Sequence, residues 1–326
     1  MISDEVFNML TKKTLQSGLK SGFNTTWELG KVVFPVTIIV TILKYTPVIN
    51  WVIAVFTPLM KWIGLPGEAA IPLVLGKILN LYAAIGAIIS LELTVKHVFI
   101  LAVMLSFSHN LIVETAVAKK IGVKGIVPVA IRLSLALISA IIINLIWQGG
   151  QETAEYGIII TPEQAPGTWL AIGALALKTA LTGVLQIAII VLPLMIGIQA
   201  LKDLHAIDYL SKWFEPLTRI LGLSSGRTSI PLLAGIIFGL AYGAGVIIES
   251  AREENLSKKD LYLLSIFLVS SHAVIEDTLI FIPLGINVIN LLIIRVIVAF
   301  IVTMLTARVW KKLIVKTKII TKGEVK

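Results

Sequence analysis

Two clusters of polar residues lie inside otherwise apolar segments of the sequence. The first is Ser108-His109-Asn110 followed by Glu114-Thr115, and the second is Ser271-His272 followed by Glu276-Asp277-Thr278. Histidine titrates near neutral pH, and a neighbouring carboxylate can share its proton, help to bind a divalent cation, or accept hydrogen bonds from a sugar or base. The residues alone leave these three chemistries open.

Helical spacing distinguishes the two clusters. On a continuous helix His109 and Glu114, five residues apart, would lie about 140° from each other around the axis. His272 and Glu276, four residues apart, would share one face. We therefore predict that only the pair of His272 and Glu276 acts together. Ionisable groups inside a membrane span are costly and usually face a bundle interior, a partner or water, so both clusters are candidate sites.

Composition places these clusters in a membrane protein. Of the 326 residues, 57% are hydrophobic and 14% are charged, whereas soluble domains carry about 25% charged residues. The absence of cysteine excludes disulfides and thiolate metal sites. The net charge of +9 comes from cations in short loops and tails, so we expect a lipid bilayer as partner and no nucleic acid. Without a Walker loop, a zinc helix motif or a nucleophile elbow, we expect no cofactor and no enzyme.

Some of the apolar segments that position the clusters are uninterrupted, and others are broken by polar or helix-breaking residues. Two segments, 67–91 and 226–248, are broken by Gly, Pro and polar residues, and we interpret them as re-entrant hairpins beside a cavity. Segments 47–64 and 203–222 contain tryptophan and proline and are expected to lie in the membrane interface. Six windows have a length that crosses a bilayer, or nearly so: 29–45, 97–118, 125–148, 180–201, 261–285 and 286–307.

Charge placement predicts the orientation. Lysine and arginine concentrate in cytoplasmic loops, and the loop 149–168 contains three glutamates but neither lysine nor arginine. We therefore predict six crossings in the cell (inner) membrane with both termini cytoplasmic. The predicted regions are an amphipathic arm (1–26), a first repeat (27–148), an extracytoplasmic acidic loop (149–168), a second repeat (169–310) and a basic tail (311–326).

An internal repeat relates the two halves. Pro35, Pro58 and Gly64 match Pro193, Pro216 and Gly222 at an offset of 158 residues, and Pro72 and Gly76 match Pro231 and Gly235 at 159. The residues Ser108, His109, Thr115 and Arg132 match Ser271, His272, Thr278 and Arg295 at 163. Three crossings and one hairpin per copy would make the second copy inverted. We therefore predict an all-α polytopic membrane protein of two inverted repeats, each with three spanning helices, an interfacial helix and a re-entrant hairpin.

The order of a proline-containing span, a proline-broken surface helix ending in Gly, an Ile-Pro hairpin and a polar span resembles the Gate, or nucleoside-recognition, domain. Similar domains occur in concentrative nucleoside transporters, the membrane part of the bacterial ferrous-iron transporter and spore maturation membrane proteins. The resemblance implies a secondary transporter of a small polar, nucleoside-like solute, with alternating access around a midplane site. The alternatives are a divalent-cation transporter or channel and a non-transporting membrane assembly factor. A coupling ion and a homo-oligomer are also compatible with the resemblance.

The candidate residues divide into two groups. We expect Glu114, Arg132, Asp277 and Arg295 to form structural or coupling ion pairs, because a buried arginine needs an acid. No metal ligand set is assigned. The candidate substrate-binding residues are Asn80, Tyr82, Ser108, His109, Asn110, Gly239, Tyr242, Ser271, His272 and Glu276.

Overall fold

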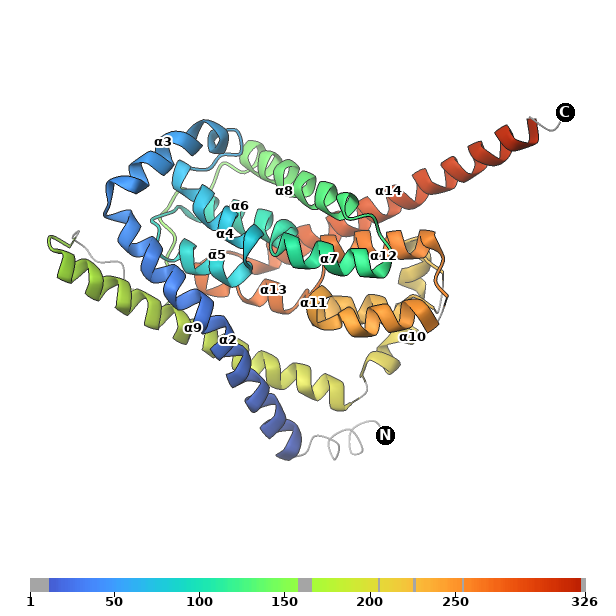
Figure 1. Cartoon of the computed structure of the whole chain (residues 1–326), viewed down its shortest axis with the longest axis horizontal. Helices are drawn as coiled ribbons and strands as arrows, with labels where there is room; N and C mark the ends of the chain where they lie inside the picture. Colours follow the sequence, from blue (N-terminus) through green and yellow to red (C-terminus); the bar gives the residue numbers. More distant parts are fainter. Residues whose placement is uncertain (1–11, 158–165, 205, 225–226, 254, 324–326) are drawn as a thin grey trace. The chain divides into compact units, whose positions relative to one another are not determined.

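The computed structural model describes residues 12–157, 166–204, 206–224, 227–253 and 255–323. Within these ranges the chain is helical, and an isolated antiparallel bridge between Thr94 and Thr153 is the one β-type pairing. The elements are α2 Lys12–Lys44, α3 Pro47–Lys61, η1 Gly67–Ala69, α4 Ala70–Ile78, α5 Leu81–Ile88, α6 Val95–Ser108, α7 Leu111–Ile121, α8 Ile126–Ile146, α9 Trp169–Asp203, α10 Ala206–Ile220, α11 Ser229–Glu253, α12 Lys258–Ser270, α13 Glu276–Leu279, η2 Ile282–Leu284 and α14 Val288–Gly323 (Figure 1).

Five stretches of the described chain are long and apolar enough to cross a membrane. They are Lys12–Lys44, Val95–Ile121, Ile126–Ile146, Trp169–Asp203 and Val288–Lys312. The all-α fold of a polytopic membrane protein is therefore confirmed. The prediction of a continuous sixth span over 261–285 was wrong, because α12 ends at Ser270 and the following residues form only the short elements α13 and η2.

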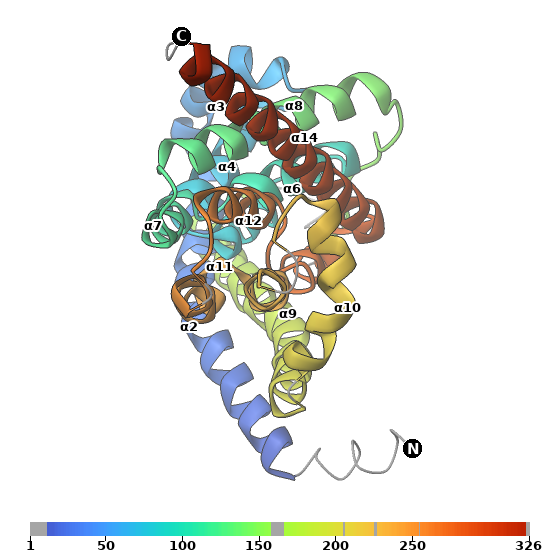
Figure 2. The ribbon, with the colours of Figure 1, turned by 90° about the vertical axis from the view of Figure 1, so that its right-hand side faces the viewer.

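Helices α2 and α9 lie side by side in Figures 1 and 2. A Cβ atom added at Gly18 would lie 2.7 Å from the Cα of Ile196, and one at Gly22 would lie 2.9 Å from Leu192. The residue numbers of the contacts thus decrease along α9 as they increase along α2, so the two helices run antiparallel. Because α2 and α9 carry the equivalent prolines of the two repeats, this pair has the inverted relation that the repeat predicts.

The glycines of α2 explain how closely these helices approach. Small residues four positions apart allow the backbones of two helices to pack in contact, and Gly18 and Gly22 have this spacing. The Thr14 hydroxyl also donates to the carboxylate of Asp203 at 2.6 Å. Residues 12–26 of the predicted arm belong to α2.

The described chain forms two compact units. Among the described residues, those of unit 1 lie within Met1–Ile112, Arg132–Leu204 and Ile275–Leu292, and those of unit 2 lie within Val113–Ile131, His205–Val274 and Ile293–Lys326. The chain leaves unit 1 shortly after His109 and leaves unit 2 shortly after His272. Each unit consequently contains residues of both repeats.

Unit 1 contains the first broken segment. Helices α4 and α5 have 9 and 8 residues and pack against each other (Figure 1). At 1.5 Å per residue neither reaches half of the roughly 30 Å hydrocarbon thickness of a bilayer. The chain breaks at Leu79 and Asn80, and the Asn80 side chain caps α5 by accepting a hydrogen bond from the Ala83 N–H at 2.9 Å.

Unit 2 contains the second broken segment, and its break lies at the equivalent position. Helix α11 is interrupted at Gly239, whose φ of 77° and ψ of 174° are not helical. Gly239 lies 159 residues after Asn80, which is the offset that relates the two broken segments. A left-handed φ at this point favours glycine, because a Cβ would be strained there. The two repeats therefore interrupt the same helix by different means, a capping asparagine in one and a glycine in the other.

Candidate functional site

Both polar clusters lie where a helix is interrupted. In unit 1, α6 ends at Ser108, and Asn110 has a positive φ of 47° and donates its N–H to the Gly76 carbonyl at 2.7 Å. In unit 2, the equivalent Ala273 has a φ of 41° and donates its N–H to the Gly235 carbonyl at 3.1 Å. Left-handed backbone is uncommon for residues other than glycine and marks a constrained position. The broken helical segment of each repeat thus holds the turn that follows the histidine.

These interruptions overturn the reasoning from helical spacing. Because α12 ends at Ser270 and α13 begins at Glu276, His272 and Glu276 do not share a face of one helix, and that prediction was wrong. Helix α6 likewise ends before His109, so the angle expected between His109 and Glu114 does not apply.

A fully buried arginine stabilises the helix end in each unit. Arg132 donates to the carbonyls of Phe107 and His109 at 2.7 and 2.6 Å, and Arg295 donates to the carbonyl of His272 at 2.8 Å. Both arginines are 0% exposed. The last carbonyls of a helix lack intrahelical donors, and a positive charge there also complements the helix dipole. The two arginines therefore fix equivalent backbone turns, and their expected pairing with acids stays a prediction.

The hydrogen bonds of the histidine rings determine which ring nitrogen faces the site. His109 Nδ1 lies 2.8 Å from the Leu105 carbonyl, and His272 Nδ1 lies 2.9 Å from the Leu268 carbonyl. A carbonyl oxygen only accepts, so Nδ1 carries hydrogen in both rings. Nε2 is then the nitrogen that remains to take up a proton or bind a cation.

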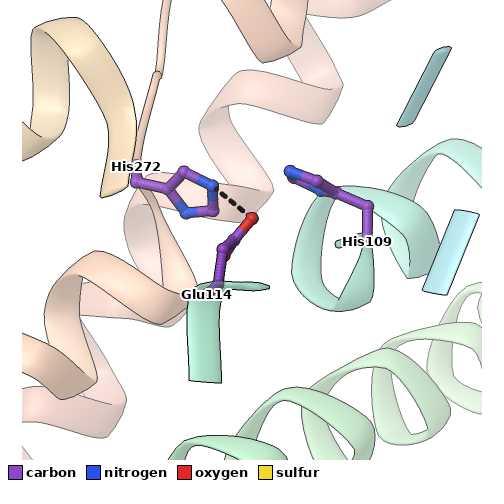
Figure 3. A group of neighbouring side chains, drawn as sticks. All are labelled: His109, Glu114 and His272. Carbon is purple, nitrogen blue, oxygen red and sulfur yellow. Dashed lines mark ion pairs between the residues drawn. The ribbon is translucent and has the colours of Figure 1, made fainter. Parts of the chain in front are cut away.

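Each histidine faces a carboxylate that belongs to the other repeat. In unit 2, His272 Nε2 lies 3.2 Å from Glu114 Oε1, and Figure 3 shows these two side chains pointing toward each other. In unit 1, His109 Nε2 lies 3.8 Å from Asp277 Oδ2. All four residues are buried. The chain thus contains two equivalent His–carboxylate pairs, one in each unit.

The contact of each histidine with the carboxylate of the other repeat was not predicted, although the sequence contained a sign of it. Glu114 and Asp277 are 163 residues apart, the offset that also relates the two histidines and the two arginines. Equivalent residues of two repeats can pair across a twofold relation, but the sequence does not reveal whether each histidine contacts the acid of its own repeat.

A buried Gln186, which donates to the Pro283 carbonyl at 3.3 Å in unit 1, was also missed.

The remaining candidate residues have more varied surroundings. Tyr82 donates its hydroxyl to Glu276 Oε1 at 2.5 Å within unit 1, so these two predicted site residues do come together. Ser108 donates to the Met104 carbonyl at 2.7 Å. The buried Ser271 hydroxyl has no hydrogen-bond partner among the described residues. Tyr242 belongs to α11, but its side chain lies outside the described part of the structure.

A different carboxylate, outside the membrane-spanning helices, is held by hydroxyl groups. Asp260 accepts hydrogen bonds from the Ser224 N–H and hydroxyl at 2.8 Å each and from the Ser257 hydroxyl at 2.6 Å. Burial by itself raises the pKa of Asp260, but the hydrogen bonds from Ser257 and Ser224 and the charge of Lys259 outweigh it and lower the pKa below its ordinary value. This carboxylate is therefore a structural anion that joins the start of α12 to the residues after α10.

The helices and the two buried pairs define a polytopic α-helical membrane protein made of two copies of one motif. The chain belongs to the Gate family, described as nucleoside recognition, whose model matches residues 26–127 and 184–306. It is also 55% identical over 301 residues to the uncharacterized membrane protein YvoD of Bacillus subtilis (strain 168), covering 92% of this chain and 96% of that protein. No solved structure shows a significant match to the chain.

Proposed function

We propose that the protein is a secondary transporter of a small polar solute in the cell membrane, with both termini in the cytoplasm. The family description makes a nucleoside-like solute the first candidate. The observation that carries the proposal is the pair of buried His–carboxylate contacts at equivalent helix interruptions. Ionisable groups at membrane depth are costly and usually belong to a substrate or ion pathway. Interrupted helices are the usual location of binding sites in transporters made of repeats.

The chemistry of the pairs favours proton coupling. With Nδ1 of His272 donating to a carbonyl, the 3.2 Å contact between Nε2 and Glu114 requires a proton between the two atoms. Removal of that proton would leave a buried carboxylate facing a lone pair of the imidazole, which is unfavourable. A solute that donates a hydrogen bond to this carboxylate would replace the proton, so binding of the solute and binding of the proton would be linked.

The broken helices fit this proposal as re-entrant hairpins. The arms on either side of Asn80 and Gly239 are too short to span a bilayer by themselves. Their interruptions leave backbone groups that need partners, and a solute-lined cavity can supply these. We propose that the two hairpins give access to the two equivalent pairs in turn.

Uptake into proteoliposomes tests the function. The purified chain would be reconstituted with an imposed pH gradient, and uptake of labelled nucleosides would be measured for wild type, Glu114→Gln and Asp277→Asn. We expect gradient-driven uptake by wild type and loss of its pH dependence in both variants, since an amide retains size and hydrogen bonding but cannot share a proton. The control is Glu28→Gln, which changes the charge of an exposed residue paired with Lys31 on α2.

Other results would support other functions. An Nδ1–H bonded to a carbonyl also orients histidines that bind metals, so uptake of a divalent cation that fails in His272→Ala would favour the cation transporter. Accessibility separates both from an assembly factor. The chain has no cysteine, so Leu79→Cys and Phe238→Cys, next to the two breaks, can be labelled without background. Absence of any flux, with both cysteines unreactive from either side of the membrane, would refute transport.

A further inference from the structure

A cavity of about 330 Å³ in unit 2 is lined by positive side chains. Its walls come from the end of α10 and the turn after it, the start of α12 and the C-terminal part of α14. Lys259, Arg308 and Lys311 supply the charge, and Trp310, Ile220 and Gly222 supply much of the remaining surface. None of the residues that line this cavity belongs to the His–carboxylate pairs.

The cations of this cavity, Lys259, Arg308 and Lys311, form no salt bridge with the residues that the structure describes. Lys259 Nζ donates to the Gly222 carbonyl at 2.5 Å, which fixes its position without reducing its charge. The carboxylate of Asp260 interacts electrostatically with Lys259, but Asp260 does not line the cavity. Three cations and no acidic residue line the cavity, and such a lining favours an anionic ligand.

The surface beside the cavity is suited to lipid chains. Four residues of α14 at every fourth position are exposed by 46–52% and apolar: Ile293, Ile297, Ile301 and Leu305. This apolar row ends where Arg308, Trp310 and Lys311 begin. The Trp310 ring lies 5.4 Å from the ring of Tyr262, and such aromatic residues concentrate where the hydrocarbon meets the headgroups. The apolar row and the cationic cavity together match an amphiphile with an anionic head.

We propose that this cavity binds the phosphate group of an anionic phospholipid, whose acyl chains lie along the apolar row of α14. Basic pockets between helices at the cytoplasmic boundary are a recurring form of lipid-headgroup site. Lys259, Arg308 and Lys311 hold the phosphate, the Trp310 N–H is available as a further donor, and Ile220 contacts the glycerol and the first methylenes. A free phosphate shares the charge but cannot use the apolar row.

Quenching of tryptophan fluorescence tests the site in the full chain. The purified protein in detergent would be titrated with phosphatidylglycerol or phosphatidylcholine carrying brominated acyl chains, which quench nearby indoles. The contribution of Trp310 is the difference between the chain and its Trp310→Phe variant. We expect that component to be quenched by phosphatidylglycerol at lower mole fraction than by phosphatidylcholine. Each basic residue near an anionic headgroup contributes roughly a fivefold gain in affinity, so Arg308→Gln with Lys311→Gln should weaken binding about 25-fold.

The control variant is Lys12→Gln with Lys13→Gln, which removes the same charge from exposed positions on α2 and should leave the preference unchanged. Equal quenching by the two lipids, or an unchanged preference in the Arg308 and Lys311 variant, would overturn the proposal. Complete displacement of the brominated lipid by inorganic phosphate would assign the cavity to a free anion instead. If the double variant does not fold, Lys311→Gln alone should still show about a fivefold loss, and no loss would contradict the site.

Discussion

The contact between His272 and Glu114 makes a quantitative prediction about stability. The side chains are 4% and 2% exposed, and their atoms Nε2 and Oε1 are 3.2 Å apart. Removing one member of a buried ion pair leaves the other without compensation and typically costs about 3–5 kcal/mol. We expect His272→Ala and Glu114→Ala each to lower the free energy of unfolding by an amount in that range. A hydrogen bond to a charged group contributes about 1.5–3 kcal/mol, so the double variant should cost less than the sum by this amount.

The equivalent pair of unit 1 provides an internal comparison. His109 Nε2 and Asp277 Oδ2 are 3.8 Å apart, which is too long for a hydrogen bond. The direct electrostatic attraction falls only with the inverse of the distance, so the pair keeps some coupling but loses the hydrogen-bond part. We expect a coupling energy below about 1 kcal/mol for His109 and Asp277.

Denaturant unfolding in mixed micelles, followed by circular dichroism, measures both cycles. Each cycle needs the wild type, two single variants and the double variant. If the alanine variants do not fold, the same cycle can be made with His272→Gln and Glu114→Gln, which preserve volume. A coupling energy within about 0.5 kcal/mol of zero for His272 and Glu114 would refute the assignment of this pair. A larger value for the unit 1 pair than for the unit 2 pair would refute the role given to the hydrogen bond.

Three further predictions concern packing, backbone conformation and pH. Gly18→Ala should destabilise the protein by about 1–3 kcal/mol in the same unfolding assay, because the added Cβ would overlap Ile196. The control is Gly197→Ala, whose added Cβ has no neighbour within 4 Å and which should be neutral or slightly stabilising. Gly239→Ala should cost at least about 1–2 kcal/mol, since its φ of 77° is unfavourable for alanine, and an unchanged melting temperature would contradict the break in α11. The lowered pKa of Asp260 gives stability that is present above the ordinary aspartate pKa of about 3.9 and is lost as the pH falls through the lower folded value. Asp260→Asn should therefore lower the melting temperature at neutral pH and reduce the decline of the melting temperature in acid. Equal acid sensitivity of wild type and variant would exclude this carboxylate as the cause.

The repeat was the most informative feature of the sequence. Prolines, glycines and the Ser-His pair recur at nearly constant offsets, and such residues have specific backbone or polar requirements that unrelated helices do not share. The offset predicted correctly that Pro35 and Pro193 lie in equivalent helices, and α2 and α9 are antiparallel as an inverted repeat requires. The positions of the site residues within their helices were predicted less well, because the polar segments were expected to be continuous helices and are interrupted next to both histidines.

Composition and hydropathy by themselves determined that this chain is an all-α membrane protein, because continuous apolar runs of bilayer length form helices, which satisfy their backbone hydrogen bonds within one segment. The repeat and its resemblance to the Gate domain also determined the family. Tertiary structure alone decided which acid meets which histidine. A sequence records the polar residues of a segment. The turn after His109, however, depends on a hydrogen bond to Gly76 and the turn after His272 on one to Gly235, and both glycines belong to broken segments elsewhere in the sequence. These turns end the helices and direct each histidine toward the carboxylate of the other repeat, which no local pattern specifies.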